Sequence, residues 1–128
     1  MSRKIINTPK APAPVGAYNQ AILHNGVLYV SGQIALDPTS GELVTGDIET
    51  ETRRVLDNMG AILEAAGTSY ANVLKCSVFV SDMGNFGRIN TVYAGYFDEA
   101  TAPARALVEV ANLPKYVNVE ISCIAAVD

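Results

Sequence analysis

Tryptophan is absent from this 128-residue chain, histidine occurs once, cysteine occurs twice, and only 17% of the residues are charged. A metal site usually needs several His or Cys ligands, and a Ser-His-Asp triad needs a histidine that reaches both a nucleophile and a carboxylate. The single histidine, His24, lies beside an expected hairpin turn, where we expect it to be exposed. We therefore expect neither a metal site nor serine-hydrolase chemistry.

Basic residues are few and scattered. The nine Lys and Arg residues form no run longer than two, and the formal net charge is −4. A nucleic-acid binder needs a basic stripe that displaces counterions from phosphates, so we do not expect RNA or DNA as the main partner. Gly26, Gly32 and Gly41 are not spaced as a phosphate-binding loop that opens a helix, so we expect no nucleotide cofactor.

Long apolar runs are also missing. No stretch approaches the ~20 apolar residues that cross a bilayer, and the first four residues are not followed by the apolar segment of a signal peptide. Cys76 and Cys123 each fall within a strand-like run, which favours two buried thiols over a disulfide scaffold. These features predict a soluble, cytoplasmic protein without a membrane partner. The low charged fraction also indicates that another subunit covers part of the surface.

What the chain does contain is 49% hydrophobic residues, enough for a substantial core. At this length we expect one domain over residues 1–128. The prolines of residues 1–17 predict an extended lead-in rather than a helix. Asn25-Gly26, between two strand-like runs, predicts a two-residue hairpin, and Gly32 in the second strand suggests a bulge.

Two segments show helical periodicity. Apolar residues recur at helical spacing over residues 48–66, with Thr45 or Asp47 as the N-cap and Gly67 at the end. A second helix is predicted after Ser81-Asp82. Its apolar face comprises Phe86, Ile89, Tyr93 and Phe97, with Asn90 as the one amide between them.

Three further strands are predicted over residues 73–80, 105–110 and 117–127, where side chains alternate. The order of elements is then strand, strand, helix, strand, helix, strand, strand. This order predicts an α+β fold in which both helices pack on one face of the sheet.

Arg105 is the most informative polar residue, because it begins a strand whose pattern is otherwise typical of the core. A guanidinium there is costly to desolvate unless a carboxylate meets it, and its planar fork suits bidentate binding of a carboxylate. That carboxylate belongs either to a substrate or to an internal ion pair with Glu109 or Glu120. The residues alone leave both interpretations open.

Glu120 lies between two apolar residues in the last strand. A carboxylate among apolar neighbours tends to a raised pKa, which suits positioning a water or transferring a proton. The alternative is that Glu120 faces solvent with Asn118 and Ser122. Asn90 is similarly either a ligand donor or the partner of a nearby backbone group.

The motifs Pro103-Ala104-Arg105 and Val119-Glu120-Ile121 are the most specific in the chain. Further motifs lie at residues 14–18, 30–34, 56–58, 78–80, 89–93 and 109–115. Together they cover nearly the whole chain and resemble the Rid family, the reactive-intermediate deaminases, also called the YjgF family.

The resemblance implies a chorismate-mutase-like fold, with a mixed β-sheet and two helices on one face. It implies a homotrimer with three clefts at the subunit interfaces. The implied activity is hydrolysis of 2-imino and enamine acids, such as 2-iminopropanoate and 2-iminobutanoate, to 2-keto acids and ammonia. No cofactor and no metal would be needed.

Site roles follow from the resemblance by position. Arg105 would bind the substrate carboxylate and Glu120 would orient a water. The other residues expected to line the cleft are Tyr18, Ser31, Gly32 and Asn90, with the backbone at Leu107.

The chain departs from the family pattern at two positions. Ala17 stands where many members have Pro, and Leu107 stands where the active subgroup often has Cys, so the preferred imine is left open. One alternative function is a non-catalytic ligand-binding or chaperone-like module that uses the same cleft. A second is an RNA-cleaving translation inhibitor, against which the acidic charge and the single histidine argue.

Overall fold

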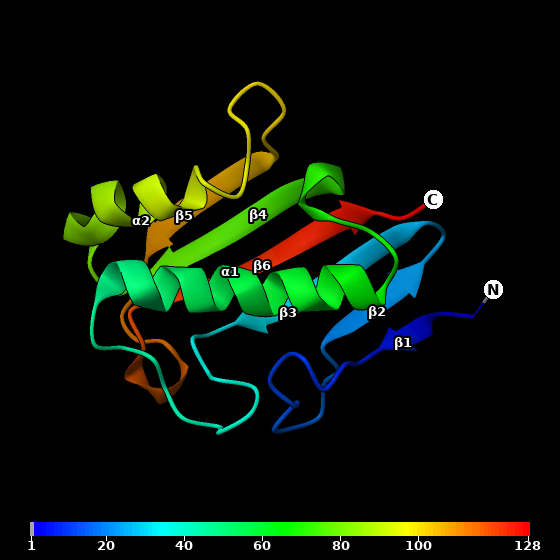
Figure 1. The fold of residues 1–128 in the computed structure, drawn as a ribbon, viewed down its shortest axis with the longest axis horizontal. Helices are drawn as coiled ribbons and strands as arrows, with labels where there is room; N and C mark the ends of the chain where they lie inside the picture. Colours follow the sequence, from blue (N-terminus) through cyan, green and yellow to red (C-terminus); the bar gives the residue numbers. More distant parts are fainter. Residues whose placement is uncertain (1) are drawn as a thin grey trace.

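A computed structural model describes residues 2–128, which form one sheet and two helices (Figure 1). The strands are β1 (Lys4–Ile6), β2 (Ala21–His24), β3 (Val27–Gln33), β4 (Val73–Val80), β5 (Ala104–Glu109) and β6 (Val119–Ala126), and the helices are α1 (Ile48–Ala65) and α2 (Phe86–Tyr93).

The sheet has the strand order β1-β2-β3-β6-β4-β5. β4 and β5 run parallel and every other neighbouring pair runs antiparallel, so the sheet is mixed. Both helices lie on the same face, with α1 crossing the middle strands and α2 beside β4 and β5 (Figure 1). The predicted α+β class, with a mixed sheet and two helices on one face, is confirmed. None of the helices in residues 2–128 has the length and apolar character needed to cross a membrane.

The predicted hairpin joins β2 and β3. Asn25 has a φ of 53° and Gly26 a φ of 76°, so both residues adopt the left-handed conformation that a tight two-residue hairpin turn requires. The expected bulge is also present, because the register between β3 and β6 shifts between Val30 and Gln33. Gly32 lies in this irregular segment, which positions its backbone close to β6.

α1 begins and ends where the sequence predicts. The Asp47 carboxylate accepts hydrogen bonds from the Thr50 amide at 3.1 Å and the Thr50 hydroxyl at 2.6 Å, and so caps the first turn. Gly67 has a φ of 83° just after the helix. The first turn also carries Glu51, which is fully buried.

The core lies between the helices and one face of the sheet. Alternate residues of each central strand point toward the helices, and the alternation agrees with the strand register. The main buried side chains are Leu28 and Val30 from β3, Cys76, Val78 and Val80 from β4, Val119, Ile121, Cys123 and Ala125 from β6, and Val55, Leu56, Met59, Ile62 and Leu63 from α1.

Several sequence predictions need correction. The lead-in contains the short strand β1, which pairs with β2. The second helix is shorter than predicted, so Phe97 follows it, although Phe97 is still buried against Tyr93 with ring centroids 4.7 Å apart. Phe86, expected to be buried, is 40% exposed, and His24 is partly buried rather than exposed.

The expectation that the strand at Arg105 belongs to the core is wrong. β5 is the outer strand of the sheet and pairs only with β4, and five of its six residues are exposed. Val108 is an example, with 46% of its surface accessible. The apolar residues of β5 are therefore no evidence that this strand is buried within one chain.

Candidate functional site

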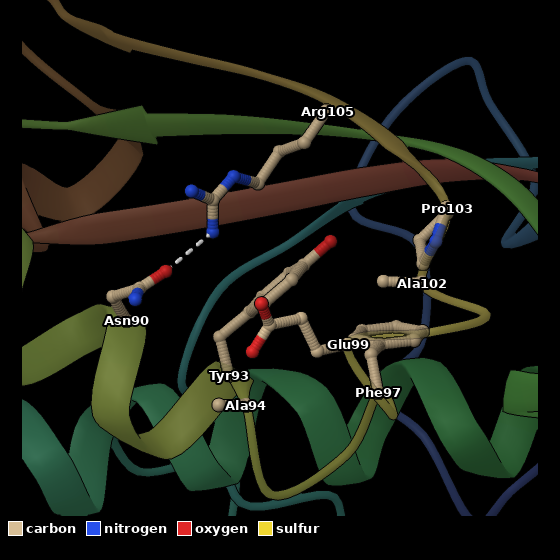
Figure 2. Close-up of a pocket in the computed structure, with 8 residues that line it drawn as sticks. All are labelled: Asn90, Tyr93, Ala94, Phe97, Glu99, Ala102, Pro103 and Arg105. Atoms are coloured by element: carbon tan, nitrogen blue, oxygen red, sulfur yellow. Dashed lines mark hydrogen bonds between the residues drawn. The ribbon is translucent and has the colours of Figure 1, made fainter.

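Arg105 lies on β5 and points toward α2. It pairs in parallel register with the buried Cys76 of β4, which fixes its side chain on the helix-covered face. Its Nη1 donates a hydrogen bond of 2.8 Å to Oδ1 of Asn90 on α2 (Figure 2). The guanidinium carbon lies 4.8 Å from the centroid of the Tyr93 ring and 5.7 Å from that of Phe86. These distances are typical of cation–π contacts, so α2 holds the cation through one amide and two rings.

The internal ion pair that the sequence left open for Arg105 does not form. Within residues 2–128, the ion pairs are those of Arg88 with Asp47 and Glu49. The carboxylate of Glu109 instead accepts a hydrogen bond of 2.8 Å from the Met83 amide. The guanidinium thus keeps its capacity to bind an external carboxylate.

A pocket of about 530 Å³ opens beside Arg105. Arg105, Asn90 and Tyr93 form one end of it (Figure 2). The remaining wall comes from the residues after α2 and from the segment before β5. It comprises Ala94, Phe97, Glu99, Ala102 and Pro103.

Glu120 lies on the opposite face of the sheet from Arg105. Its register partner on β4 is Phe79, whose neighbours in sequence point toward the helices. The side chain is half-buried, and burial raises the pKa of its carboxyl above the usual 4.5. Gly32 borders it closely, because a Cβ at this position would lie 2.8 Å from Cδ of Glu120. A side chain at position 32 would therefore displace the carboxylate from the place it has here.

The other predicted residues divide between the two faces. Leu107 shares the face of Arg105, because it pairs with the buried Val78, and it is partly buried. Ser31 follows the alternation of β3 onto the face of Glu120, where its hydroxyl donates a hydrogen bond of 2.6 Å to the Asn19 carbonyl.

Tyr18 lies in the segment before β2 and is 49% exposed. Its hydroxyl accepts a hydrogen bond of 3.3 Å from the Val15 amide, which folds the lead-in over the ring. The structure thus brings Arg105 together with Asn90, and Glu120 together with Gly32. The sheet separates these two groups within one chain.

Sequence reasoning missed the aromatic contacts of Arg105. Phe86 and Tyr93 fit an apolar helical stripe and were expected to serve only the core. Their distance of seven residues places them on one helix face, two turns apart, with Asn90 between them. One signal could have identified this arrangement. The amide of Asn90 lies between two aromatic residues on one helix face, and an edge strand of the sheet carries an arginine.

The part of the chain that the structure describes contains no cluster of three or more His, Cys, Asp or Glu residues suited to a metal ion. Cys76 and Cys123 are free, buried and opposite each other on β4 and β6. Burial raises the pKa of both thiols, which lowers the fraction of reactive thiolate. The thiols therefore act as small core residues.

Comparison with known proteins gives consistent matches. The profile of the family described as Endoribonuclease L-PSP matches residues 8–127. A RutC family protein of Synechocystis is 55% identical over 126 residues, which cover 98% of this chain and 97% of that protein. A 2-iminobutanoate/2-iminopropanoate deaminase of Rattus norvegicus is 49% identical over 123 residues, which cover 96% of this chain and 89% of that protein.

Solved structures show the same fold. The crystal structure of YyfA from Yersinia pestis, described as a protein of unknown function of the conserved Rid family, matches with a TM-score of 0.95 and 45% identity. The match covers 98% of this chain and 100% of that one. The similarity therefore extends over the whole sheet and both helices.

Proposed function

This chain belongs to the Rid family, whose sequence profile is described as Endoribonuclease L-PSP, and from this membership we propose that it hydrolyses reactive 2-imino acids to 2-keto acids and ammonia. One observation carries the proposal. The guanidinium of Arg105 borders an open pocket and is held by an amide and two aromatic rings, with no acidic partner among residues 2–128.

Arg105 binds the substrate through its carboxylate. Nη1 is occupied by Asn90, which leaves the other donors of the planar fork for two parallel hydrogen bonds to an incoming acid. The rings of Tyr93 and Phe86 fix the plane of the guanidinium, so little side-chain entropy is lost when the acid binds. Asn90 then acts by positioning Arg105.

Glu120 supplies the proton transfers. The reaction adds water across the C=N bond and then releases ammonia from the resulting carbinolamine. In the first step the Glu120 carboxylate takes a proton from the attacking water as the C–O bond forms and passes it to the imine nitrogen, which gives the neutral carbinolamine and regenerates the carboxylate. In the second step the carboxylate takes the hydroxyl proton of the carbinolamine and passes it to the amino nitrogen, while the C=O bond forms and the C–N bond breaks, so that the 2-keto acid and ammonia leave and the carboxylate is again regenerated. A carboxylate with a raised pKa suits both directions of transfer.

The active cleft forms between two copies of the chain. Arg105 and Glu120 lie on opposite faces of one sheet, so one copy cannot direct both at a single small molecule. The face of the sheet away from the helices provides apolar surface for a neighbour, including Tyr29 on β3 and Val108 on β5, each about half exposed. A closed trimer would contain three such clefts, each with Arg105 of one copy opposite Glu120 of the next.

The activity test generates 2-iminopropanoate or 2-iminobutanoate with a pyridoxal-phosphate-dependent dehydratase and follows the appearance of the 2-keto acid. We expect the purified protein to accelerate loss of the imine without added cofactor. Arg105→Ala and Glu120→Gln should each remove most of the acceleration. Arg105→Lys, which keeps the charge but not the fork, should retain only a part of it.

Two results would count against the proposal. The first is decay of the imine at the uncatalysed rate in the presence of folded, assembled protein. The second is tight binding of a 2-keto acid by calorimetry without any turnover, which would instead support a non-catalytic ligand-binding module.

A further inference from the structure

We propose that the pocket beside Arg105 is a side-chain subsite, which favours 2-imino acids with large, uncharged side chains and disfavours those with a second carboxylate. The inference rests on the proposed deaminase function and adds a substrate class to it. Its residues are Ala94, Phe97, Glu99, Ala102 and Pro103, which extend the pocket away from the guanidinium.

The pocket is large compared with a small 2-imino acid. Its volume of about 530 Å³ falls within the ~300–1,000 Å³ range of pockets that hold drug-sized ligands. An acid of three or four carbons bound through Arg105 fills only a small part of this space. A branched or aromatic side chain would occupy the remainder and exclude water from it.

Four of the residues that line the pocket beyond Arg105 are apolar: Ala94, Phe97, Ala102 and Pro103. Ala94 and Ala102 face the pocket with single methyl groups, so the room beside them is space that a larger residue would fill. Phe97 provides a fixed apolar surface, because it is 5% exposed and packs against the Tyr93 ring. Pro103 restricts the backbone directly before β5. These four residues give the pocket an apolar part away from the cation.

The pocket also carries one negative charge away from Arg105. Glu99 is the one acidic residue of the lining, and its side chain extends from the loop toward Tyr93 (Figure 2). It forms no ion pair with a basic residue in the described part of the chain. A second carboxylate on the ligand would approach this like charge, whereas an uncharged side chain would not.

Binding of 2-keto acids, the reaction products, tests the subsite by calorimetry on the assembled protein. We expect 4-methyl-2-oxopentanoate to bind at least about tenfold more tightly than pyruvate, because its branched chain buries additional methyl groups. Ala102→Leu should bring that ratio close to one. The matched control is Ala100→Leu in the same loop, which is exposed and outside the pocket and should leave the ratio unchanged.

Glu99→Gln tests the charge argument. It should raise the affinity for 2-oxoglutarate relative to pyruvate by about three- to tenfold at low ionic strength. A wild-type preference for pyruvate would overturn the proposal. An unchanged size ratio in folded Ala102→Leu would also overturn it, with Ala102→Val as the substitute if the leucine variant does not assemble.

Kinetics separates this inference from the function on which it rests. With an amino-acid oxidase supplying imines of alanine and leucine, the subsite predicts that Ala102→Leu lowers kcat/KM for the leucine-derived imine selectively. If Ala102→Leu hydrolyses both imines with the same selectivity as wild type, the subsite is refuted and the deaminase proposal stands. If the protein binds keto acids according to size but hydrolyses no imine, the deaminase proposal is refuted and the subsite stands.

Discussion

At the residue scale, Gly32 leaves room for the side chain of Glu120. A methyl group at position 32 would overlap the end of the Glu120 side chain, which is flexible and can move away. Gly32→Ala should therefore fold normally but displace the carboxylate. Because a displacement of about 1 Å at the chemistry can cost ~100-fold, we expect kcat for imine hydrolysis to fall by one to two orders of magnitude.

The matched control for this change is Gly46→Ala. Gly46 is exposed, and a Cβ there would meet nothing within 4 Å. It should leave both kcat and the melting temperature close to wild type. Equal activity of Gly32→Ala and Gly46→Ala would show that the position of the Glu120 carboxylate does not limit the rate.

Glu120 should also link activity to pH and to stability. Burial raises its pKa in the folded state above 4.5, so the folded protein holds this proton more tightly than the unfolded chain. Protonated Glu120 therefore contributes to the stability of the folded protein below the pKa of the unfolded chain, and this contribution is lost as the pH rises through the pKa of the folded state. Glu120→Gln should therefore melt about 1–2 °C higher than wild type at pH 7.5, a small effect because the side chain is half-exposed.

Thermal unfolding from pH 3.5 to 8 measures this difference. The difference in melting temperature between Glu120→Gln and wild type should shrink as the pH falls through the raised pKa of Glu120, and it should vanish below pH 4.5. Wild-type kcat should decline over the same window, because the base form of Glu120 is lost. A variant that is less stable than wild type at pH 7.5 would show that the carboxylate stabilises the fold instead.

At the scale of elements, α1 positions the beginning of β6 through one buried charge. Oε2 of Glu51 accepts hydrogen bonds from the backbone amides of Asn118 at 2.7 Å and Val119 at 3.2 Å. Oε1 accepts a third from the Asn118 side chain at 2.8 Å. These contacts hold the two residues directly before Glu120.

Glu51→Gln should destabilise the protein by about 2–4 kcal/mol, because an amide cannot accept all three hydrogen bonds and a buried donor is left unpaired. Urea unfolding measures the change. Glu64→Gln, an exposed substitution on the same helix, should stay within about 0.5 kcal/mol of wild type. Similar midpoints for the two variants would contradict the role assigned to Glu51.

The elements that depend on local signals could be predicted from the sequence. The hairpin at Asn25-Gly26 needs positive φ at two adjacent residues, and α1 carries both its cap and its terminating glycine. β1 could not be predicted, since three residues owe their strand conformation to pairing with β2. The burial of β5 was misjudged for a similar reason, because an apolar edge strand and a core strand have the same pattern.

The candidate site was predictable as a set of residues but not as an arrangement. Arg105 and Glu120 stand out as charges within apolar strands. Their placement on opposite faces depends on the register of both strands with β4, which no local pattern specifies. The partners of Arg105 on α2 were missed because their spacing also fits a core stripe.

At the scale of the whole molecule, imine hydrolysis by Arg105 and Glu120 requires an assembly, because the two side chains lie on opposite faces of one sheet. Val108 lies on the face of Glu120 at the sheet edge and is 46% exposed. If the proposed trimer buries Val108, Val108→Glu should yield smaller species in sedimentation and lower activity by at least about tenfold, because a buried unpaired charge opposes association. Val108→Thr, which keeps the shape, should remain assembled. A fully active monomer would refute the composite cleft.

Complementation between two inactive variants tests whether Arg105 and Glu120 from different copies share one cleft. Arg105→Ala and Glu120→Gln chains are unfolded together, refolded as a mixture and assayed for imine hydrolysis, with mass spectrometry to verify mixed trimers. If each cleft takes Arg105 from one copy and Glu120 from the next, random mixing regenerates intact clefts at about a quarter of the sites, and that share of wild-type activity should return. Mixed trimers that remain as inactive as either variant alone would contradict the account.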